Sequence, residues 1–144
     1  FGVHTMPPVE SRAMQRVIHY IDANLDKPLP VDRLAEISGF SRSHFSRLFA
    51  QSEGMPPAEY VLLRRLKQST RLLASGDHTV KEVSGMAGFA DPNYFAKVFR
   101  RYFRVSPTEF RKIGLAASIM TMNTETSPPA LQKEPVEYPE ADAD

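Results

Sequence analysis

The segments LAEISGFSRSHFSRLF (Leu34–Phe49) and VSGMAGFADPNYFAKVF (Val83–Phe99) are two copies of one pattern. Their first halves align at an offset of 49 residues, which brings Gly39 onto Gly88. One additional residue enters the second turn, and beyond it the offset is 50 as far as Tyr60 on Phe110. Helical spacing of apolar residues alone rarely produces such a match, so the chain contains a duplicated structural unit.

Each copy consists of a short helix, a turn that contains glycine, and a longer helix whose first turn is polar. This is the helix-turn-helix arrangement, in which the second helix enters the major groove of DNA by its N-terminal end. The inner face of that second helix must be apolar in order to pack on the first. Three residues in each copy supply this face: Phe45, Leu48 and Phe49, and Phe95, Val98 and Phe99.

Apolar spacing and capping signals extend the pattern over the first 113 residues. They predict helices at about 9–25, 31–38, 42–52, 57–74, 80–86 and 92–103, and a short last helix from Ser106-Pro107 to near Lys112. Ser41 and Asp91 are predicted N-caps, and Thr79 with Glu82 forms a predicted capping box. No strand pattern is present. The predicted fold is all-α, with two helix-turn-helix units joined by a long linker helix and about seven helices.

The predicted organisation has three parts. We expect a linker at residues 1–8, a double helix-turn-helix DNA-binding domain at 9–113 and a tail at 114–144. The domain divides into a first unit (9–55), the linker helix (56–75) and a second unit (76–113). A linker helix of about 18 residues is roughly 27 Å long. That length suits two recognition helices in successive major grooves, which are roughly 34 Å apart.

Charge divides the chain in the same way. Residues 1–113 hold 17 Lys and Arg against 11 Asp and Glu, a balance of +6, whereas residues 114–144 hold one Lys against six acids, a balance of −5. The basic part suggests a polyanionic partner such as double-stranded DNA, but charge alone favours the alternative of a solvated surface that happens to be basic. The acidic tail is rich in Pro and poor in large apolar residues, so we expect it to be disordered, and either inert or a weak competitor of phosphate.

Other function classes find no support in the sequence. There is no cysteine, the four histidines lack ligand-like spacing, and no glycine-rich phosphate loop is present. We therefore expect no enzyme, no metal and no cofactor. No apolar run approaches the roughly 20 residues that span a bilayer, and no signal peptide opens the chain. We expect no membrane partner and a cytoplasmic location.

Residues 10–113 resemble the DNA-binding domain of the AraC/XylS family of bacterial transcription regulators. The resemblance rests on LAEISGFSRSHFSRLF, on EYVLLRRLKQSTRLL and above all on GFADPNYFAKVFRRYFRVSPTEFRK (Gly88–Lys112). It implies a seven-helix domain that binds DNA, usually attached to a separate ligand-sensing or dimerisation domain, which we expect outside these residues. RNA polymerase is a further expected partner.

Three features depart from the family's pattern. Pro30 and Pro56 stand where the second copy has helix-capping residues, Arg104 replaces the usual glycine, and Pro92 begins the second recognition helix. We expect the local structure to tolerate all of them.

Base contacts are predicted for the outward residues near the start of each recognition helix, because arginine suits a bidentate contact with guanine and serine can bond a base edge or a phosphate. These residues are Arg42, Ser43, Ser46 and Arg47 in the first copy and Pro92, Asn93, Ala96 and Lys97 in the second. Since Pro92 and Ala96 offer bases no hydrogen bond, we expect the second unit to read less sequence and hold more backbone. Phosphate contacts are predicted for His44, Arg64, Arg65, Lys67, Arg71, Arg100, Arg101 and Arg104.

Alternatives remain open for several of these side chains. Arg47 could pair with Glu36 or Glu53, Asn93 could be only a solvated or capping residue, and His44 could be a half-packed surface histidine. For the whole chain the alternative function is a helical protein-interaction module with a basic docking face. Two recognition helices in register, with small and basic outward residues, favour DNA.

Overall fold

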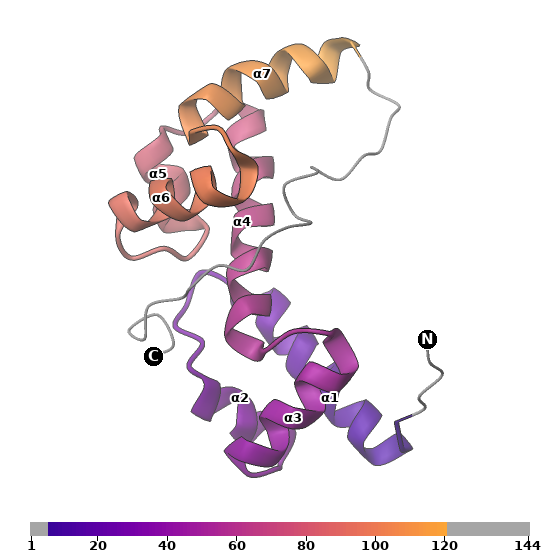
Figure 1. The fold of residues 1–144 in the computed structure, drawn as a ribbon. Coiled ribbons are helices and arrows are strands. Elements are labelled where there is room, and N and C mark those ends of the chain that lie inside the picture. The colour runs from indigo at the N-terminus through magenta and orange to yellow at the C-terminus, as the bar shows by residue number, and fades with distance from the viewer. Residues whose placement is uncertain (1–5, 121–144) are drawn as a thin grey trace. The chain divides into compact units, whose positions relative to one another are not determined.

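The computed structural model describes the backbone of residues 6–120 and the side chains of residues 6–114, and this part contains seven helices and no strand. The helices are α1 (Pro8–Ala23), α2 (Val31–Ser38), α3 (Arg42–Glu53), α4 (Pro57–Ser75), α5 (Val80–Met86), α6 (Pro92–Phe103) and α7 (Pro107–Met120) (Figure 1). The predicted all-α class is therefore confirmed.

The chain divides into two compact units whose boundary lies inside α4, between Arg64 and Arg65. Within the described residues, unit 1 is 6–64 and holds α1, α2, α3 and the first half of α4. Unit 2 is 65–120 and holds the second half of α4 with α5, α6 and α7. Each unit thus contains one copy of the sequence repeat.

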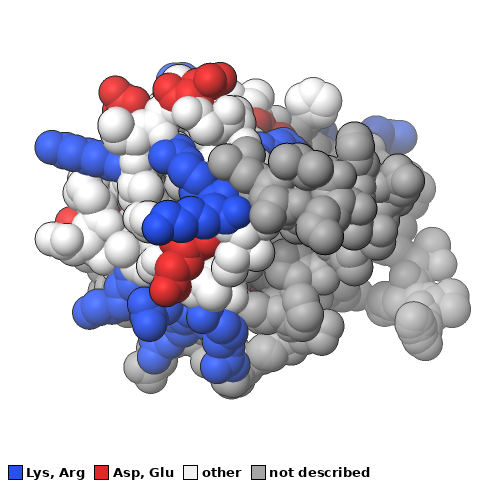
Figure 2. Space-filling view, turned by 90° about the horizontal axis from the view of Figure 1, so that it is seen from above, with Lys and Arg blue, Asp and Glu red and all other residues white. Residues whose placement is uncertain are grey.

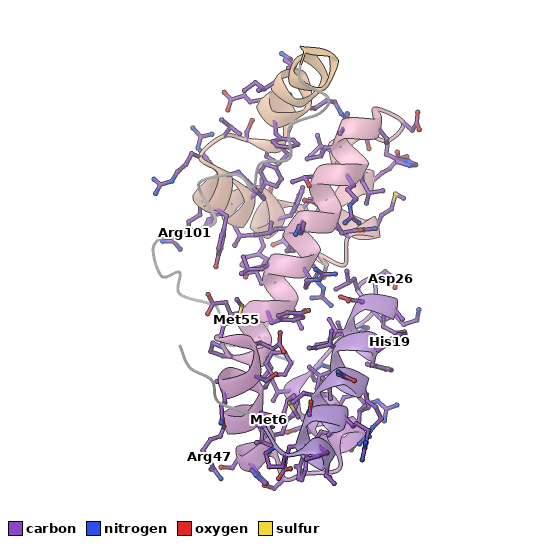
Figure 3. All side chains as sticks on the ribbon, turned by 90° about the vertical axis from the view of Figure 1, so that its right-hand side faces the viewer. Met6, His19, Asp26, Arg47, Met55 and Arg101 are labelled. Atoms are coloured by element: carbon purple, nitrogen blue, oxygen red, sulfur yellow. The ribbon has the colours of Figure 1, made fainter. Side chains whose placement is uncertain are left out.

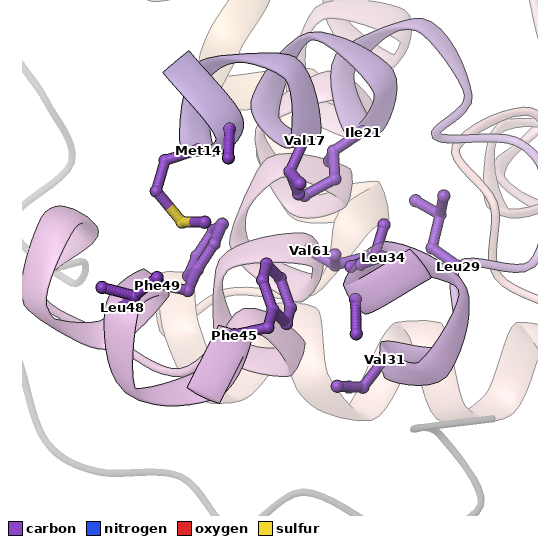
Figure 4. Packing of buried hydrophobic residues seen from close by; sticks show 12 residues of the cluster. Met14, Val17, Ile21, Leu29, Val31, Leu34, Phe45, Leu48, Phe49 and Val61 are labelled. Atoms are coloured by element: carbon purple, nitrogen blue, oxygen red, sulfur yellow. The ribbon is translucent and has the colours of Figure 1, made fainter. Parts of the chain in front are cut away.

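The core of unit 1 forms where α1 packs on both helices of the first repeat copy. Met14, Val17 and Ile21 are spaced to lie on one face of α1, and they point toward the side chains of α2 and α3 (Figure 4). Phe45 and Phe49 of α3 are fully buried in this cluster. Burying a side chain of this size contributes about 1.5–3 kcal/mol, so the inner face of α3 is fixed by the core.

Unit 2 buries the equivalent face of α6 between α5 and α7. Phe95 and Phe99 are fully buried, and the ring of Phe99 lies 4.5 Å from that of Phe103 and 5.5 Å from that of Phe110 on α7. Aromatic pairs at such separations add about 0.5–1.5 kcal/mol beyond their buried area. The aromatic cluster therefore joins α6 firmly to α7.

The duplication seen in the sequence is reproduced in the packing. Phe49 and Tyr60 meet edge to face in unit 1, with centroids 5.3 Å apart and planes at 76°. The aligned pair in unit 2, Phe99 and Phe110, has centroids 5.5 Å apart and planes also at 76°. The two repeat copies therefore share one packing scheme.

The predicted turn and cap signals are confirmed. Gly39 ends α2 in the left-handed region with φ 85°, a conformation that glycine adopts without steric cost. Thr79 and Glu82 form the capping box of α5, through a bond from Thr79 N to Glu82 Oε1 of 2.9 Å and one from Glu82 N to Thr79 Oγ1 of 3.0 Å. Ser41 caps α3 by accepting from His44 N at 3.1 Å.

Two predicted helix ends are wrong. α1 ends at Ala23, not near residue 25, because Asn24 leaves the helical conformation and its side-chain amide donates to Tyr20 O at 2.8 Å. α7 continues to Met120 although the sequence predicted an end near Lys112.

The extension of α7 also corrects the expected start of the disordered tail. Gly114 lies inside the helix, and the residues after it, LAASIM, contain good helix formers and no proline. Residues 114–120 are thus helical, and the remainder of the predicted tail, 121–144, lies outside the described residues. At the other end, Pro8 is the first residue of α1 and not part of a linker, while residues 1–5 lie outside the described part.

Candidate nucleic-acid interface

The two recognition helices, α3 and α6, expose the same positions. From Ser41 to Ala50 and from Asp91 to Arg100, the ten residues follow one identical order of exposed, half-buried and buried side chains. The predicted base-reading residues Arg42, Ser43, Arg47, Pro92, Asn93 and Lys97 are exposed, while Ser46 and Ala96 are half-buried. Each helix therefore presents its predicted set of four side chains together on an outward face near its N-terminus.

Arg47 lies on the outer side of α3, away from the core of unit 1 (Figure 3). Its Nη1 donates to Ser43 Oγ, one turn earlier, at 3.2 Å. Glu36 instead pairs with Arg33 at 3.1 Å, and Glu53 accepts a bond from Ser52 Oγ at 2.7 Å. The alternative ion pairs considered for Arg47 are thus not formed, and its guanidinium and the Ser43 hydroxyl stand side by side at the surface.

Arg42 has an acidic partner that sequence reasoning missed. Its Nη1 lies 2.9 Å from Oδ1 of Asp32 on α2, and both side chains are well exposed. The two residues are ten positions apart and meet only because the turn brings α2 back against α3. No local sequence signal marks such a pair.

α6 begins with a different chemistry. The carboxylate of Asp91 accepts from Asn93 N at 2.9 Å, and Pro92 occupies the first helical turn, where its missing N–H costs nothing. Asp91, and not Asn93, is thus the capping residue of α6. The Asn93 side chain itself is exposed. Lys97 is the strongest hydrogen-bond donor among the four outward positions of α6.

The basic residues predicted to contact phosphate are not equivalent in the structure. On α4, the Nε of Arg64 lies 3.0 Å from Asp22 Oδ1, and its guanidinium lies 5.9 Å from the ring centroid of Tyr60. Burial raises the pKa of the Tyr60 phenol, as does the Asp22 carboxylate, whereas Arg64 lowers it. Arg64 is therefore already engaged within unit 1, and its phosphate contact stays a prediction.

Further along α4, Arg65 is half-buried and Lys67 is exposed, while Arg71 donates to Gln68 Oε1 at 3.3 Å. Arg100 and Arg101 are exposed in the last turn of α6, and Figure 3 shows Arg101 projecting outward from that helix. Figure 2 shows Lys and Arg gathered in groups on the described part of the face that it presents.

His44 packs against Phe40, with ring centroids 4.8 Å apart in an edge-to-face arrangement. It is half-buried at the N-terminal turn of α3. This position agrees with the alternative of a half-packed surface histidine, and the phosphate contact of His44 stays a prediction.

Arg111 has a clear structural role that the sequence did not reveal. Its Nε donates to Leu73 O at 3.0 Å and its Nη2 donates to His78 O, so one half-buried guanidinium ties α7 to the end of α4 and the loop before α5. Hydrogen bonds from a charged donor contribute about 1.5–3 kcal/mol. Arg111 therefore stabilises the packing of α7 in unit 2 without lying on the outward face of α6.

The described part of the chain holds neither a metal site nor a membrane-spanning helix. No group of three or more His, Asp or Glu side chains there is placed to hold a metal ion. None of the helices described is both long and apolar enough to cross a membrane.

Comparison with known proteins agrees with this geometry. A family profile described as "Helix-turn-helix domain" matches residues 4–113. The probable transcriptional regulator LumQ of Photobacterium leiognathi is 31% identical over 103 residues, which are 72% of this chain and 42% of LumQ. The chain spans about a third of two further curated regulators, so these relatives are longer proteins.

Two solved structures are similar in sequence and fold. The AraC-type transcriptional regulator structure from Chromobacterium violaceum has a TM-score of 0.67 and 28% identity, over 72% of this chain and 93% of that one. The DNA-binding domain of AdpA, a global transcriptional factor crystallised with a target DNA, has a TM-score of 0.69 and 28% identity, over 78% and 98%. With the family match over residues 4–113, these similarities show that the chain belongs to the AraC-type helix-turn-helix family of transcription regulators.

Proposed function

We propose that this chain is the DNA-reading domain of a bacterial transcription regulator and binds duplex DNA sequence-specifically through α3 and α6. The observation that carries the proposal is the shared exposure pattern of the two helices. Each one buries an aromatic inner face in its own unit and leaves four side chains near its N-terminus exposed or half-buried. A helix held in this way can enter a major groove without disturbing the core.

The similarity to AdpA supports DNA as the ligand, because the domain of that protein was crystallised with a target DNA. The occupation of successive grooves on one DNA face stays a prediction from the length of the linker helix. RNA polymerase and a ligand-sensing or dimerisation domain complete the proposal as partners of the whole protein, with the bacterial cytoplasm as its location.

The test is a binding selection on randomised duplex DNA with the 144-residue chain, read out by sequencing. We expect enrichment of a defined sequence that the chain then binds at least ten-fold more tightly than a shuffled duplex of the same composition. Affinity should fall steeply with added salt, because Lys and Arg displace counterions from phosphate.

Two results would overturn the proposal. One is the absence of any enriched sequence from a folded sample, and the other is equal affinity for selected and shuffled duplexes. Binding to an acidic protein with no affinity for DNA would favour the interaction-module alternative instead.

A further inference from the structure

The net positive charge of residues 1–120 comes entirely from unit 2. Residues 1–64 contain seven Lys and Arg and seven Asp and Glu, so unit 1 is neutral. Residues 65–120 contain ten Lys and Arg and four acids, a balance of +6. The neutral unit is the one whose recognition helix carries two arginines and two serines at its four predicted base-reading positions.

Ion pairing sharpens this difference. Four of the seven basic side chains of unit 1 lie within 4 Å of a carboxylate: Lys27 with Asp26, Arg33 with Glu36, Arg42 with Asp32, and Arg64 with Asp22. In the free protein these four positive charges are therefore partly neutralised by the paired carboxylates.

Three of the four acids of unit 2 accept hydrogen bonds from the backbone, and one of them, Glu82, also lies 3.9 Å from Nδ1 of His78. The carboxylates of Glu82, Asp91 and Glu109 each accept from a backbone N–H near the start of a helix. The described residues include no acid within 4 Å of the ammonium of Lys97 or the guanidinium of Arg101, and both side chains are exposed. Unit 2 therefore keeps cationic groups available for an anion.

Side chains that can hydrogen-bond to bases are, by contrast, more numerous on α3 of unit 1 than on α6 of unit 2. Arg42 of α3 can bond a guanine in bidentate fashion, whereas Pro92, at the equivalent position of α6, offers bases no hydrogen bond. Ser46 can bond a base edge, whereas its equivalent Ala96 cannot. Contacts with phosphate give affinity without sequence information, and contacts with base edges give the sequence preference.

We propose that the two repeat copies have diverged into a reader and an anchor: unit 1 sets the DNA sequence, and unit 2 supplies most of the sequence-independent affinity. This inference rests on the proposed function and deepens it. It predicts an asymmetric target, with one well-defined block of base pairs and a second region of weak preference.

The repeat supplies matched variants for the test, because Arg47 and Lys97 occupy equivalent positions of α3 and α6. Arg47→Ala should flatten the base preference within the defined block, and Lys97→Ala should lower the affinity for selected and shuffled duplexes by the same factor. The binding selection on randomised duplex DNA, repeated with each variant, measures both changes. Two equally defined blocks, or loss of preference in both variants, would overturn the inference.

The salt dependence of DNA affinity tests the anchor role of unit 2 separately. Replacing Arg100 and Arg101 by Gln should reduce the slope of log affinity against log salt by about 2, since each lost phosphate contact removes about 0.9. Removing two charges from unit 1, by Arg12→Gln with Lys27→Gln, should leave the slope nearly unchanged. Equal reductions in the two double variants would contradict the anchor role. If the unaltered chain fails to discriminate duplexes at all, the proposed function itself fails, which is a different outcome from either of these.

Discussion

Arg104 is the one residue other than glycine with a positive φ in the described part of the chain, and replacing it should stabilise the protein. It ends α6 with φ 67° and ψ 10°, and its N–H donates to Arg100 O at 2.8 Å. A side chain in this left-handed region costs about 1–2 kcal/mol. A glycine removes that cost but adds about 0.4–1 kcal/mol of chain entropy to the unfolded state. Arg104→Gly should therefore raise the free energy of unfolding by about 0.5–1 kcal/mol.

The first repeat copy supplies the reverse experiment. Gly54 aligns with Arg104, has φ 79° and ψ 7°, and donates to Ala50 O at the same 2.8 Å. A Cβ built on Gly54 meets no atom within 4 Å, so Gly54→Ala adds backbone strain without a clash. This substitution should lower the free energy of unfolding by about 0.5–1 kcal/mol.

Urea unfolding followed by helical circular dichroism measures both changes, provided that the denaturant slope is constant across the variants. Arg104→Ala is the control, because it removes the guanidinium but keeps a Cβ in the left-handed conformation. We expect it to be less stable than Arg104→Gly by about 0.5–1 kcal/mol. If Arg104→Ala and Arg104→Gly have equal stability, the backbone argument is wrong and the side chain alone decides.

Substitutions at Ser84, Asp32 and Glu109 test three individual contacts. Ser84→Ala should raise the free energy of unfolding in urea by about 1 kcal/mol, because the buried Ser84 hydroxyl has no hydrogen-bond partner among the described residues. The aligned residue of the first copy, Ala35, is already an alanine. A clear loss of stability would contradict this prediction. Asp32→Asn should change the free energy of unfolding by less than about 1 kcal/mol, because the exposed ion pair between Asp32 and Arg42 contributes little. The same substitution should raise the affinity for shuffled duplex, because it frees the Arg42 guanidinium. Unchanged affinity in a filter-binding assay would refute it. The backbone hydrogen bond from Ser106 lowers the pKa of Glu109, so its stabilisation is present above the unfolded pKa and is lost as pH falls through the folded value. Glu109→Gln should therefore flatten the acid side of a profile of Tm against pH, and an identical profile would argue against this linkage.

The fold was predictable from the sequence because its signals are local and occur twice. Gly39, Ser41, Thr79 and Asp91 each fix a turn or a cap within a few residues, and each takes the predicted conformation or bond. The end of α7 was not predictable in the same way, because Gly114 reads as a stop signal yet is tolerated inside a helix.

The outward faces were predictable, but the partners of their side chains were not. The same spacing that buries Phe45 and Phe95 exposes Arg47 and Lys97, so periodicity alone is sufficient to find the faces. The ion pairs of Arg42 and Arg64 join residues 10 and 42 positions apart, which only the tertiary structure brings together.

The identical exposure pattern of α3 and α6 has a consequence for how such a domain adapts. The exposed positions that we predict to contact DNA are separate from the buried positions that hold each helix in its unit. Mutations at the outward positions can therefore accumulate without passing through an unstable ancestor, since surface substitutions usually alter stability by about 0.5 kcal/mol or less. Each copy can therefore change its outward side chains while it keeps its buried face, so one copy can lose base selectivity while the other retains it.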